Sequence, residues 1–391
     1  MLRLLTAGES HGPACVAIIE GLPAGVTLST EDINQELKKR HSDFGRGGRA
    51  LIEGDEVEIF SGVRYGKTLG SPIALVVRNL DSANWQDEMK IEEPSDINQE
   101  ADKVTRPRPG HADLAGALKY GQVDIRNISE RASARETVAR VAAGAIVKKL
   151  LGEFDIKVGS HTVQIGSVRL SHPPKDFQEV ASVFEIDPEI RCIDPEMSTK
   201  MKEAIHDASA KGNTLGGVVE VIATGVPVGL GSVMHYDRRL DGSIAQVLMS
   251  IPSVKAVEIG NAIKAATMLG SVVQDVISLK EQRFVRESNN MGGIEGGISN
   301  GEDIICRVYH KPISTLGAPA KTVDIQTHRP EPAVVERSDI CVVPRAGVVS
   351  EAMLAFVLGQ AMIEKFGGDH IDEMKCNFSC YTKSLTERLS P

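Results

Sequence analysis

The sequence predicts an α+β fold in a single domain that spans residues 1–391. Strand-like and helix-like segments occur in blocks along the chain and do not alternate as βαβ units would. Hydrophobic residues make up 41% of the chain and aromatic residues only 4%, so we expect a core of aliphatic side chains. The length would allow two or three average domains, but no linker-like segment divides the chain.

In the first part of the chain, Thr30–His41 has the apolar spacing of a helix, and its last turn is cationic, as suits a helix C-terminus. Phe44–Arg49 holds three glycines and is expected to form a flexible loop that carries Arg46 and Arg49. Val57–Phe60 and Ile73–Val77 have the composition of strands.

Ser133 and Glu136 have the spacing of a capping box, which predicts a helix from this point to Leu151. The apolar residues of this segment are small, so a neighbouring element could pack closely against it. Arg131 and Arg135 flank the first turn, where exposed amides could hold a phosphate or a carboxylate.

Further along, the pattern predicts two strands, three helices and two polar surface excursions. The strands are 218–223 and 304–309, and the helices are 243–249, 259–269 and an amphipathic helix over 350–366 that ends at Gly367 and Gly368. The surface excursions are 81–103 and 170–202.

The net charge of −9 argues against a general nucleic-acid-binding protein, because such a protein needs many cationic contacts to phosphates. The six cysteines are widely spaced and form no C-x-x-C pair, so we expect reduced thiols, and the histidines lack metal-ligand spacing. There is no signal-type segment, and no stretch approaches the roughly 20 apolar residues of a membrane span. We therefore expect a cytoplasmic protein with no nucleic-acid partner, no membrane partner and no metal.

Three short segments combine histidine, arginine and serine in a way that indicates a site for an anionic ligand. They are Gly8–Gly12, Arg106–Asp113 and Arg131–Glu136. In the second segment two prolines restrict the backbone, and we expect Arg108 and His111 to project from it; a rigid loop loses less entropy when it binds an anion.

The first segment also fits G-x-S-x-G, the nucleophile elbow of serine hydrolases, so a serine esterase that uses Ser10 is a rival hypothesis. Only seven residues precede Gly8, and Pro13 follows Gly12, which makes a strand-to-helix elbow less favourable. A second rival is a non-catalytic protein that binds phosphorylated metabolites. His11 could also be a structural residue of a tight turn, and Asp339 could be a surface ion-pair partner of Arg337.

Five segments, in this order, resemble the conserved blocks of chorismate synthases. They are Gly8–Gly12, Phe44–Arg49, Arg106–Asp113, Arg131–Glu136 and Arg337–Asp339, and the resemblance extends over essentially the whole chain. It departs locally at Ala132, where many members have a serine, and at Pro252 and Ser253, which occupy a variable position of flavin contact.

The resemblance implies a β-α-β sandwich, in which antiparallel sheets enclose helices, and a homotetramer. It implies the 1,4-anti elimination of phosphate and a ring proton from 5-enolpyruvylshikimate 3-phosphate to give chorismate. The family requires reduced FMN without net redox change. NADPH is a candidate reductant for the flavin, and an external flavin reductase is the alternative.

The resemblance also implies roles for individual residues. His11 would protonate the departing phosphate, His111 would stabilise charge at N1 of the reduced flavin, and Asp339, directly or through Ser10, would govern protonation at flavin N5. Arg49, Arg108 and Arg135 would hold the substrate. Arg40 and Arg46 match positions for NADPH. The implied flavin contacts are Arg131, Ala132, Ser133, Pro252, Ser253, Gly296, Lys311, Pro312, Ile313, Ser314, Thr315 and Arg337.

Overall fold

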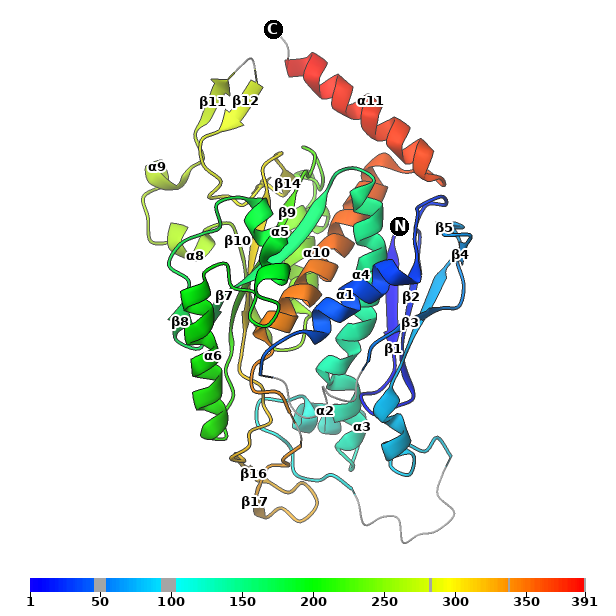
Figure 1. Cartoon of the computed structure of the whole chain (residues 1–391), viewed down its shortest axis with the longest axis vertical. Coiled ribbons are helices and arrows are strands. Elements are labelled where there is room, and N and C mark those ends of the chain that lie inside the picture. The colour runs from blue at the N-terminus through cyan, green and yellow to red at the C-terminus, as the bar shows by residue number, and fades with distance from the viewer. Residues whose placement is uncertain (46–53, 93–102, 281–282, 337, 390–391) are drawn as a thin grey trace.

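The computed structural model describes residues 1–45, 54–92, 103–280, 283–336 and 338–389. It places helices between two antiparallel sheets (Figure 1). The α+β prediction is thereby confirmed, and the layers are those of the implied β-α-β sandwich. That the chain is one domain stays a prediction.

The first sheet has the strand order β1-β2-β6-β3. Its strands are β1 (Arg3–Ala7), β2 (Ala14–Glu20), β6 (Ile73–Arg78) and β3 (Val57–Ile59). Alternate residues of β2 and β6, such as Ala17 and Leu75, are buried. They face the helical layer, because successive side chains of a strand point to opposite faces.

The second sheet has the strand order β10-β15-β9-β7-β8. Its strands are β10 (Val254–Ile259), β15 (Ile304–His310), β9 (Gly217–Thr224), β7 (Lys157–Ile165) and β8 (Val168–Arg169). In β7, Gly159 borders α5 (Phe177–Ile186), whereas Ser160 borders Gly347 of the central helix α10. Helices therefore cover both faces of this sheet.

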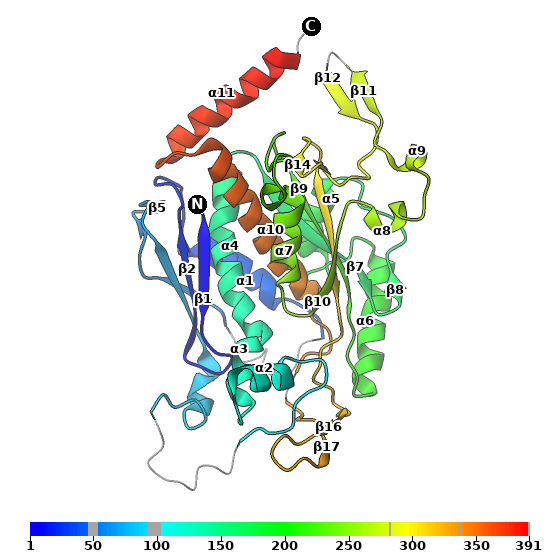
Figure 2. The same cartoon turned by 180° about the vertical axis from the view of Figure 1, so that it is seen from behind.

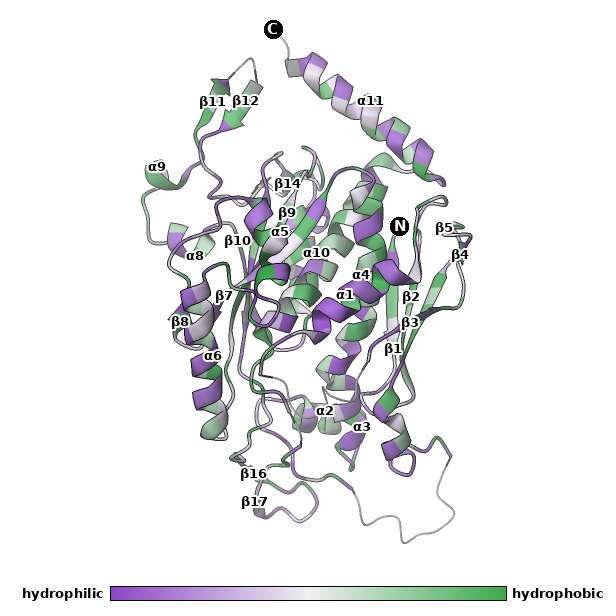
Figure 3. Cartoon of the chain, in the orientation of Figure 1, coloured by the Kyte–Doolittle hydropathy of each residue, from purple (hydrophilic) through white to green (hydrophobic). Residues whose placement is uncertain are grey.

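Four helices fill the space between the sheets (Figures 1 and 2). They are α1 (Thr30–His41), α4 (Thr137–Gly152), α7 (Leu240–Met249) and α10 (Val343–Phe366). α4 packs on the first sheet and α10 on the second, and the two helices contact each other. In Figure 3, α4 is largely hydrophobic, whereas the peripheral helix α11 (Ile371–Leu389) is largely hydrophilic.

One helix differs from the expectation that no segment could span a membrane. By length and composition, α10 is long and apolar enough to cross a membrane. However, 83% of its most apolar window is buried inside the protein, as in the core helix of a soluble fold. α10 also begins at Val343, seven residues before the predicted helix, and it is buried on most of its surface, so the prediction of an amphipathic helix is wrong.

The remaining elements lie at the ends and flanks of the sandwich. Near the lower end in Figure 1 are α2 (Asp113–Tyr120), α3 (Arg126–Ala132), β16 (Lys321–Val323) and β17 (Pro330–Pro332). Two short 3₁₀ helices are η2 (Leu80–Trp85), which follows β6, and η4 (Ala134–Glu136), which precedes α4. Elsewhere are α6 (Pro195–Ala210), η5 (Tyr236–Arg238), α8 (Ala262–Ala265), α9 (Gly270–Val273) and the short strands β4 (Val63–Arg64), β5 (Lys67–Thr68), β11 (Ile277–Lys280), β12 (Arg283–Arg286), β13 (Ile294–Glu295) and β14 (Ile298–Ser299).

Three local predictions are wrong. The segment 259–269 is not one helix, because Ile259 ends β10 and only the short α8 follows. Ser133 accepts a hydrogen bond from the amide of Arg135 and not from that of Glu136, so the capping box does not form. The excursion 170–202 contains α5 and the start of α6, whose buried residues include Val180 and Met201.

The contact between α4 and α10 generates a test of the packing. A Cβ on Gly144 of α4 would lie 2.3 Å from the Cβ of Ala352 in α10, so Gly144→Ala should lower the free energy of unfolding by about 1–3 kcal/mol. Gly152→Ala at the end of the same helix is the matched control, because a Cβ there meets no described atom within 4 Å. We expect the control to be neutral or stabilising by about 0.4–1 kcal/mol. Urea unfolding of both variants measures the difference, and equal stability would contradict close packing at Gly144.

Candidate active site

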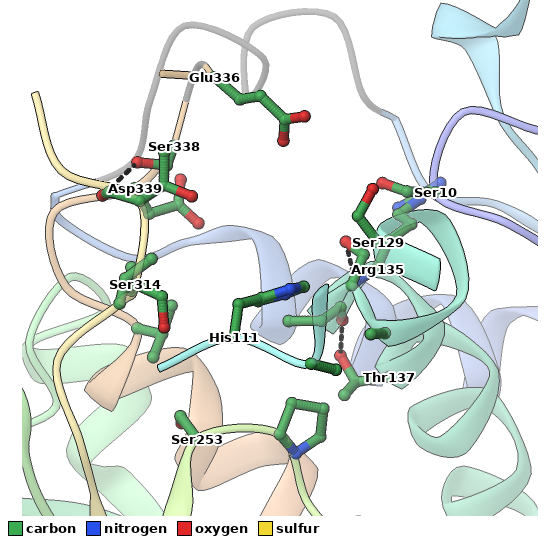
Figure 4. Close-up of a pocket in the computed structure, with 18 of the residues that line it drawn as sticks. Ser10, His111, Ser129, Arg135, Thr137, Ser253, Ser314, Glu336, Ser338 and Asp339 are labelled. Atoms are coloured by element: carbon green, nitrogen blue, oxygen red, sulfur yellow. Dashed lines mark hydrogen bonds between the residues drawn. The ribbon is translucent and has the colours of Figure 1, made fainter. Parts of the chain in front are cut away.

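A cavity of about 560 Å³ opens at the end of the sandwich where α3, η4 and the start of α10 meet. Figure 4 shows Ser314, Ser338 and Asp339 on one side of it, Ser10, Ser129 and Arg135 on the opposite side, and His111 between them. The volume lies within the usual range of small-molecule and cofactor sites.

Most of the site residues expected from the sequence line this cavity. They are Ser10, His11, Arg40, Arg108, His111, Ala132, Ser133, Arg135, Pro252, Ser253, Lys311, Pro312, Ile313, Ser314, Thr315 and Asp339. Segments that are far apart in the sequence therefore converge on one cavity.

Two expected residues that the structure describes, Arg131 and Gly296, are not among those that line the cavity. Arg131 is exposed, and its guanidinium donates to the carbonyl and the hydroxyl oxygen of Thr6 at 3.0 and 2.8 Å. Gly296 lies in the turn between β13 and β14. Arg46, Arg49 and Arg337 lie outside the described residues.

His11 is held by Glu130 of α3. One oxygen of this carboxylate lies 2.7 Å from Nδ1 of His11, and the other accepts from the His11 backbone amide at 2.7 Å. The carbonyl oxygen of Glu130 accepts from the amide of Ser10 at 3.0 Å. Burial opposes ionisation of Glu130, but the contacts with His11 outweigh it and lower the pKa of this carboxyl.

The ring of His11 also packs against Trp85, with 3.9 Å between the ring centroids. The indole nitrogen of Trp85 donates to Asp81 at 3.2 Å, and Arg126 lies over the indole ring. The imidazole is thus restricted on two sides, by a carboxylate and by an aromatic face.

Asp113, the first residue of α2, holds both Arg108 and His111. Its carboxylate accepts from Nε of Arg108 at 2.8 Å and lies 2.5 Å from Nδ1 of His111. Burial opposes its ionisation, but these partners lower the pKa of Asp113. Arg108 also donates to Thr315 and Glu336, at 3.2 and 3.0 Å. Arg108 was expected to project from its loop; its side chain lines the cavity but is folded onto Asp113 and buried.

Asp55 holds a second group of cations. One oxygen accepts from Arg135 at 2.6 Å, and the other lies 3.2 Å from Arg40 and 2.5 Å from His41. Burial again opposes ionisation, but the hydrogen bond with His41 and the charges of Arg40 and Arg135 lower the pKa of Asp55. Arg135 was expected to flank exposed amides; its side chain is instead buried in this cluster.

Asp339 pairs with Arg345 at the N-terminus of α10, at 2.9 Å. The same guanidinium binds Asp43 at 3.1 Å, and Asp43 is buried. Burial opposes the charged form of Arg345, but the two carboxylates raise its pKa. The ion pair of Asp339 in the described structure is thus with a buried arginine of the central helix.

The facing wall is formed by the segments before β10 and after β15. Lys311 donates to the carbonyl of Gly110 and, at 2.7 Å, to the hydroxyl of Ser314. Burial and the charge of Lys255 lower the pKa of Lys311. Ser253 has a φ of 73°, and its hydroxyl lies 2.9 Å from Nδ1 of the buried His310, whose pKa burial lowers to about 4.

Sequence reasoning missed several residues of the site. Glu130 stands next to a motif that was recognised, and Trp85 is the only tryptophan of the chain, so both carried a weak signal. Asp55 and Asp43 carried no signal in the sequence, because isolated aspartates in polar segments are common. Their importance comes from burial, which the sequence does not display.

Ser10 does not lie in a nucleophile elbow. The strand that precedes it, β1, pairs antiparallel with the strand that follows it, β2, and no helix starts after Gly12. An elbow requires a strand followed by a helix. Within the described residues there is also no group of three or more histidine, cysteine, aspartate or glutamate side chains that could hold a metal ion.

Comparisons with known proteins identify the family. The family model described as chorismate synthase matches residues 2–363. A chorismate synthase of Solibacter usitatus is 51% identical over 389 residues, covering 98% of this chain and 99% of the relative. One of Aquifex aeolicus is 52% identical over 397 residues, with 98% of each chain covered.

A solved structure gives the same result. It is described as a crystal structure of chorismate synthase, shares 43% identity, covers 98% of each chain and superposes with a TM-score of 0.77. The comparisons support neither the serine esterase nor the non-catalytic binder. With a family model that spans nearly all of its length and relatives at about half identity, the chain belongs to the chorismate synthase family.

Proposed function

We propose that the 560 Å³ cavity is where this chain carries out the chorismate synthase reaction. Family membership makes the chain a carbon–oxygen lyase of the shikimate pathway and of aromatic amino acid biosynthesis. The substrate is the small molecule 5-enolpyruvylshikimate 3-phosphate, which loses phosphate and a ring proton. The observation that carries the assignment to this cavity is the convergence of His11, His111, Asp339 and four arginines on one volume.

The cationic side chains suit a substrate with a phosphate and two carboxylates. Arg108 and Arg135 line the cavity, and guanidinium groups bind such anions through paired hydrogen bonds. Arg49 is proposed as a third contact on the basis of resemblance alone. As phosphate leaves, negative charge grows on its oxygen, and we assign His11 to donate a proton or a hydrogen bond there.

The elimination also removes a proton from the substrate ring, and this proton needs an acceptor. We assign Asp339 to this part of the elimination, with Ser10 as an accessory hydroxyl, because both line the cavity. Arg345 places a positive charge 2.9 Å from the Asp339 carboxylate, and only an ionised carboxylate can receive a proton. His111, fixed by Asp113, would stabilise negative charge at the cofactor edge.

Members of this family depend on a reduced flavin, and the cavity suits one. Pro252, Pro312 and Ile313 offer apolar surface to a planar ring, while Ser253, Ser314, Thr315 and Lys311 offer polar groups to its edges. A bound reduced flavin would supply electron density to the allylic system of the substrate. We propose FMN as this flavin, with Ala132 and Ser133 as further contacts; Arg131, Gly296 and Arg337 are proposed contacts by resemblance only.

We consider two sources of the electrons that reduce the flavin. Arg40 and Arg46 match positions for NADPH, which would let the chain reduce its own flavin; an external flavin reductase is the alternative. Arg40 lines the cavity but is buried against Asp55, so contact with NADPH would need this pair to open.

We propose a cytoplasmic homotetramer. Leu5, Ile18 and Phe60 are exposed around the outer face of the first sheet, and the excursion 262–286 exposes Leu269, Leu279 and Phe284. Exposed apolar groups of this kind are typical of subunit contacts.

The first prediction concerns the cofactor. Under anaerobic conditions, one equivalent of chemically reduced FMN should support many turnovers, because the elimination has no net redox change. Chorismate formation measured with and without NADPH, starting from oxidised FMN, separates self-reduction from external reduction. Product limited to one equivalent of reduced flavin would contradict the proposal.

The second prediction concerns the two imidazoles. His11→Ala and His111→Ala should each lower kcat by about 10²- to 10⁴-fold, with a smaller effect on substrate binding, since both imidazoles are assigned to charge that develops in the transition state. His172→Ala is the control, because this side chain is half exposed on the outer surface. Steady-state kinetics with reduced FMN provide the measurement, and an unchanged kcat in folded His11→Ala would return His11 to a structural role.

The third prediction concerns Asp339. Asp339→Asn should leave stability nearly unchanged, because Arg345 keeps Asp43 as a partner, but kcat should fall about 10²-fold or more, because an amide cannot accept the proton. With substrate deuterated at the abstracted position, the isotope effect on kcat should exceed that of the wild type. Normal turnover, or loss of activity only through unfolding, would remove Asp339 from the mechanism.

A further inference from the structure

We propose that Glu130 is a positioning residue that fixes the proton of His11 at Nδ1 and holds the ring as an imidazolium for donation from Nε2. This inference rests on the proposed function of His11. It concerns a carboxylate that neither the resemblance nor the sequence motifs single out.

The contact geometry determines which nitrogen of His11 can act. One oxygen of the Glu130 carboxylate lies 2.7 Å from Nδ1 of His11, and the other accepts a hydrogen bond from the backbone amide of His11 at 2.7 Å. One carboxylate therefore holds both the ring and the main chain of His11. A carboxylate accepts hydrogen bonds only, and Nδ1 must therefore carry a proton. Glu130 thus contacts the ring through Nδ1, and we assign the proton transfer in the cavity to the other ring nitrogen, Nε2.

The protonation state follows from the same contact. A neutral ring with its proton at Nδ1 has none at Nε2, so it cannot act as an acid. Only the imidazolium can donate from Nε2, and the Glu130 carboxylate at 2.7 Å from Nδ1 places a negative charge directly beside the ring. Glu130 is thus suited to supply both the tautomer and the charge that proton donation requires, much as second carboxylates orient histidines in other enzymes.

Other groups fix the pair in place. The carbonyl of Glu130 binds the amide of Ser10 at 3.0 Å, which anchors the loop after β1 to α3. Trp85 covers the His11 ring at 3.9 Å, which limits its rotation.

Several charges surround the pair in the described part of the chain. Arg126 acts on Glu130 from the same helix, Arg108 faces it from the loop before α2, and Asp81 lies behind Trp85 in η2. Glu9 is an exposed carboxylate of the His11 loop itself. All of these side chains remain in a Glu130 variant, so the comparison with wild type changes the Glu130 carboxylate alone.

The test compares Glu130→Gln, which keeps the shape of the side chain but removes its charge, with the matched control Glu9→Gln. We expect Glu130→Gln to lower kcat by about 10- to 100-fold, the usual effect of removing a group that orients a functional histidine, with little change in KM. The alkaline limb of the kcat–pH profile should move to lower pH, because the imidazolium loses its counter-charge. Glu130→Asp should recover part of both effects, and Glu9→Gln should match the wild type.

A second readout uses the protein without substrate or flavin. Hydrogen–deuterium exchange at the Cε1 carbon of histidine depends on ring protonation and can be followed by mass spectrometry. His11 is the only histidine between Arg3 and Lys38, so trypsin isolates it. The midpoint of its exchange curve should lie at lower pH in Glu130→Gln than in wild type or Glu9→Gln.

The outcomes separate this inference from the function on which it rests. An exchange midpoint in Glu130→Gln equal to that in Glu9→Gln would overturn the positioning role. A shifted midpoint with an unchanged kcat–pH profile would remove His11 as the proton donor, and the catalytic part of the inference with it. If Glu130→Gln does not fold, the same two measurements on Glu130→Asp decide, since the shorter carboxylate should weaken the contact and shift both in the same direction.

Discussion

The cavity depends on buried carboxylates that lie behind its cations. Asp55 holds Arg40 and Arg135, Asp113 holds Arg108 and His111, Glu130 holds His11, and Asp43 holds Arg345. Without these anions, cations crowded into a partly buried volume would repel one another and would lose solvation without compensation. With them, the lining is cationic toward a ligand and close to balanced within the protein.

The same arrangement explains why the cations are rigid. A guanidinium fixed by two carboxylate contacts, as Arg108 is on Asp113, loses little further freedom when an anion binds. The pKa of Asp113 and that of Asp55 are both lowered, so these carboxylates remain charged at neutral pH even though burial opposes it. Their stabilising contribution is present above the ordinary pKa of an aspartate and is lost only as the pH falls below it, well outside the range in which a histidine changes charge.

Sequence patterns predicted the framework better than the details of the site. The elements with strong periodicity, such as Thr30–His41 and the strand around Val218–Ala223, are present where expected. The segment 259–269 was misjudged because its small apolar residues suit a helix locally, whereas pairing of β10 with β15 decides its first residue. The N-terminal turns of α10 were missed because Pro344 and Arg345 resemble a loop, although proline is well tolerated in the first turn of a helix.

For the site, the motifs located the residues that face the cavity but not the residues that hold them. His11, His111 and Asp339 stand in recognisable segments, whereas Asp55 and Asp43 stand in segments with no distinctive spacing. A side chain that touches a ligand is restricted by that ligand's chemistry, which recurs as a pattern. A carboxylate that neutralises a buried arginine needs only to arrive at the right place in the fold, and many backbone routes can bring it there. The supporting half of an active site is therefore a property of tertiary structure, as the contact of Glu130 with Nδ1 of His11 illustrates.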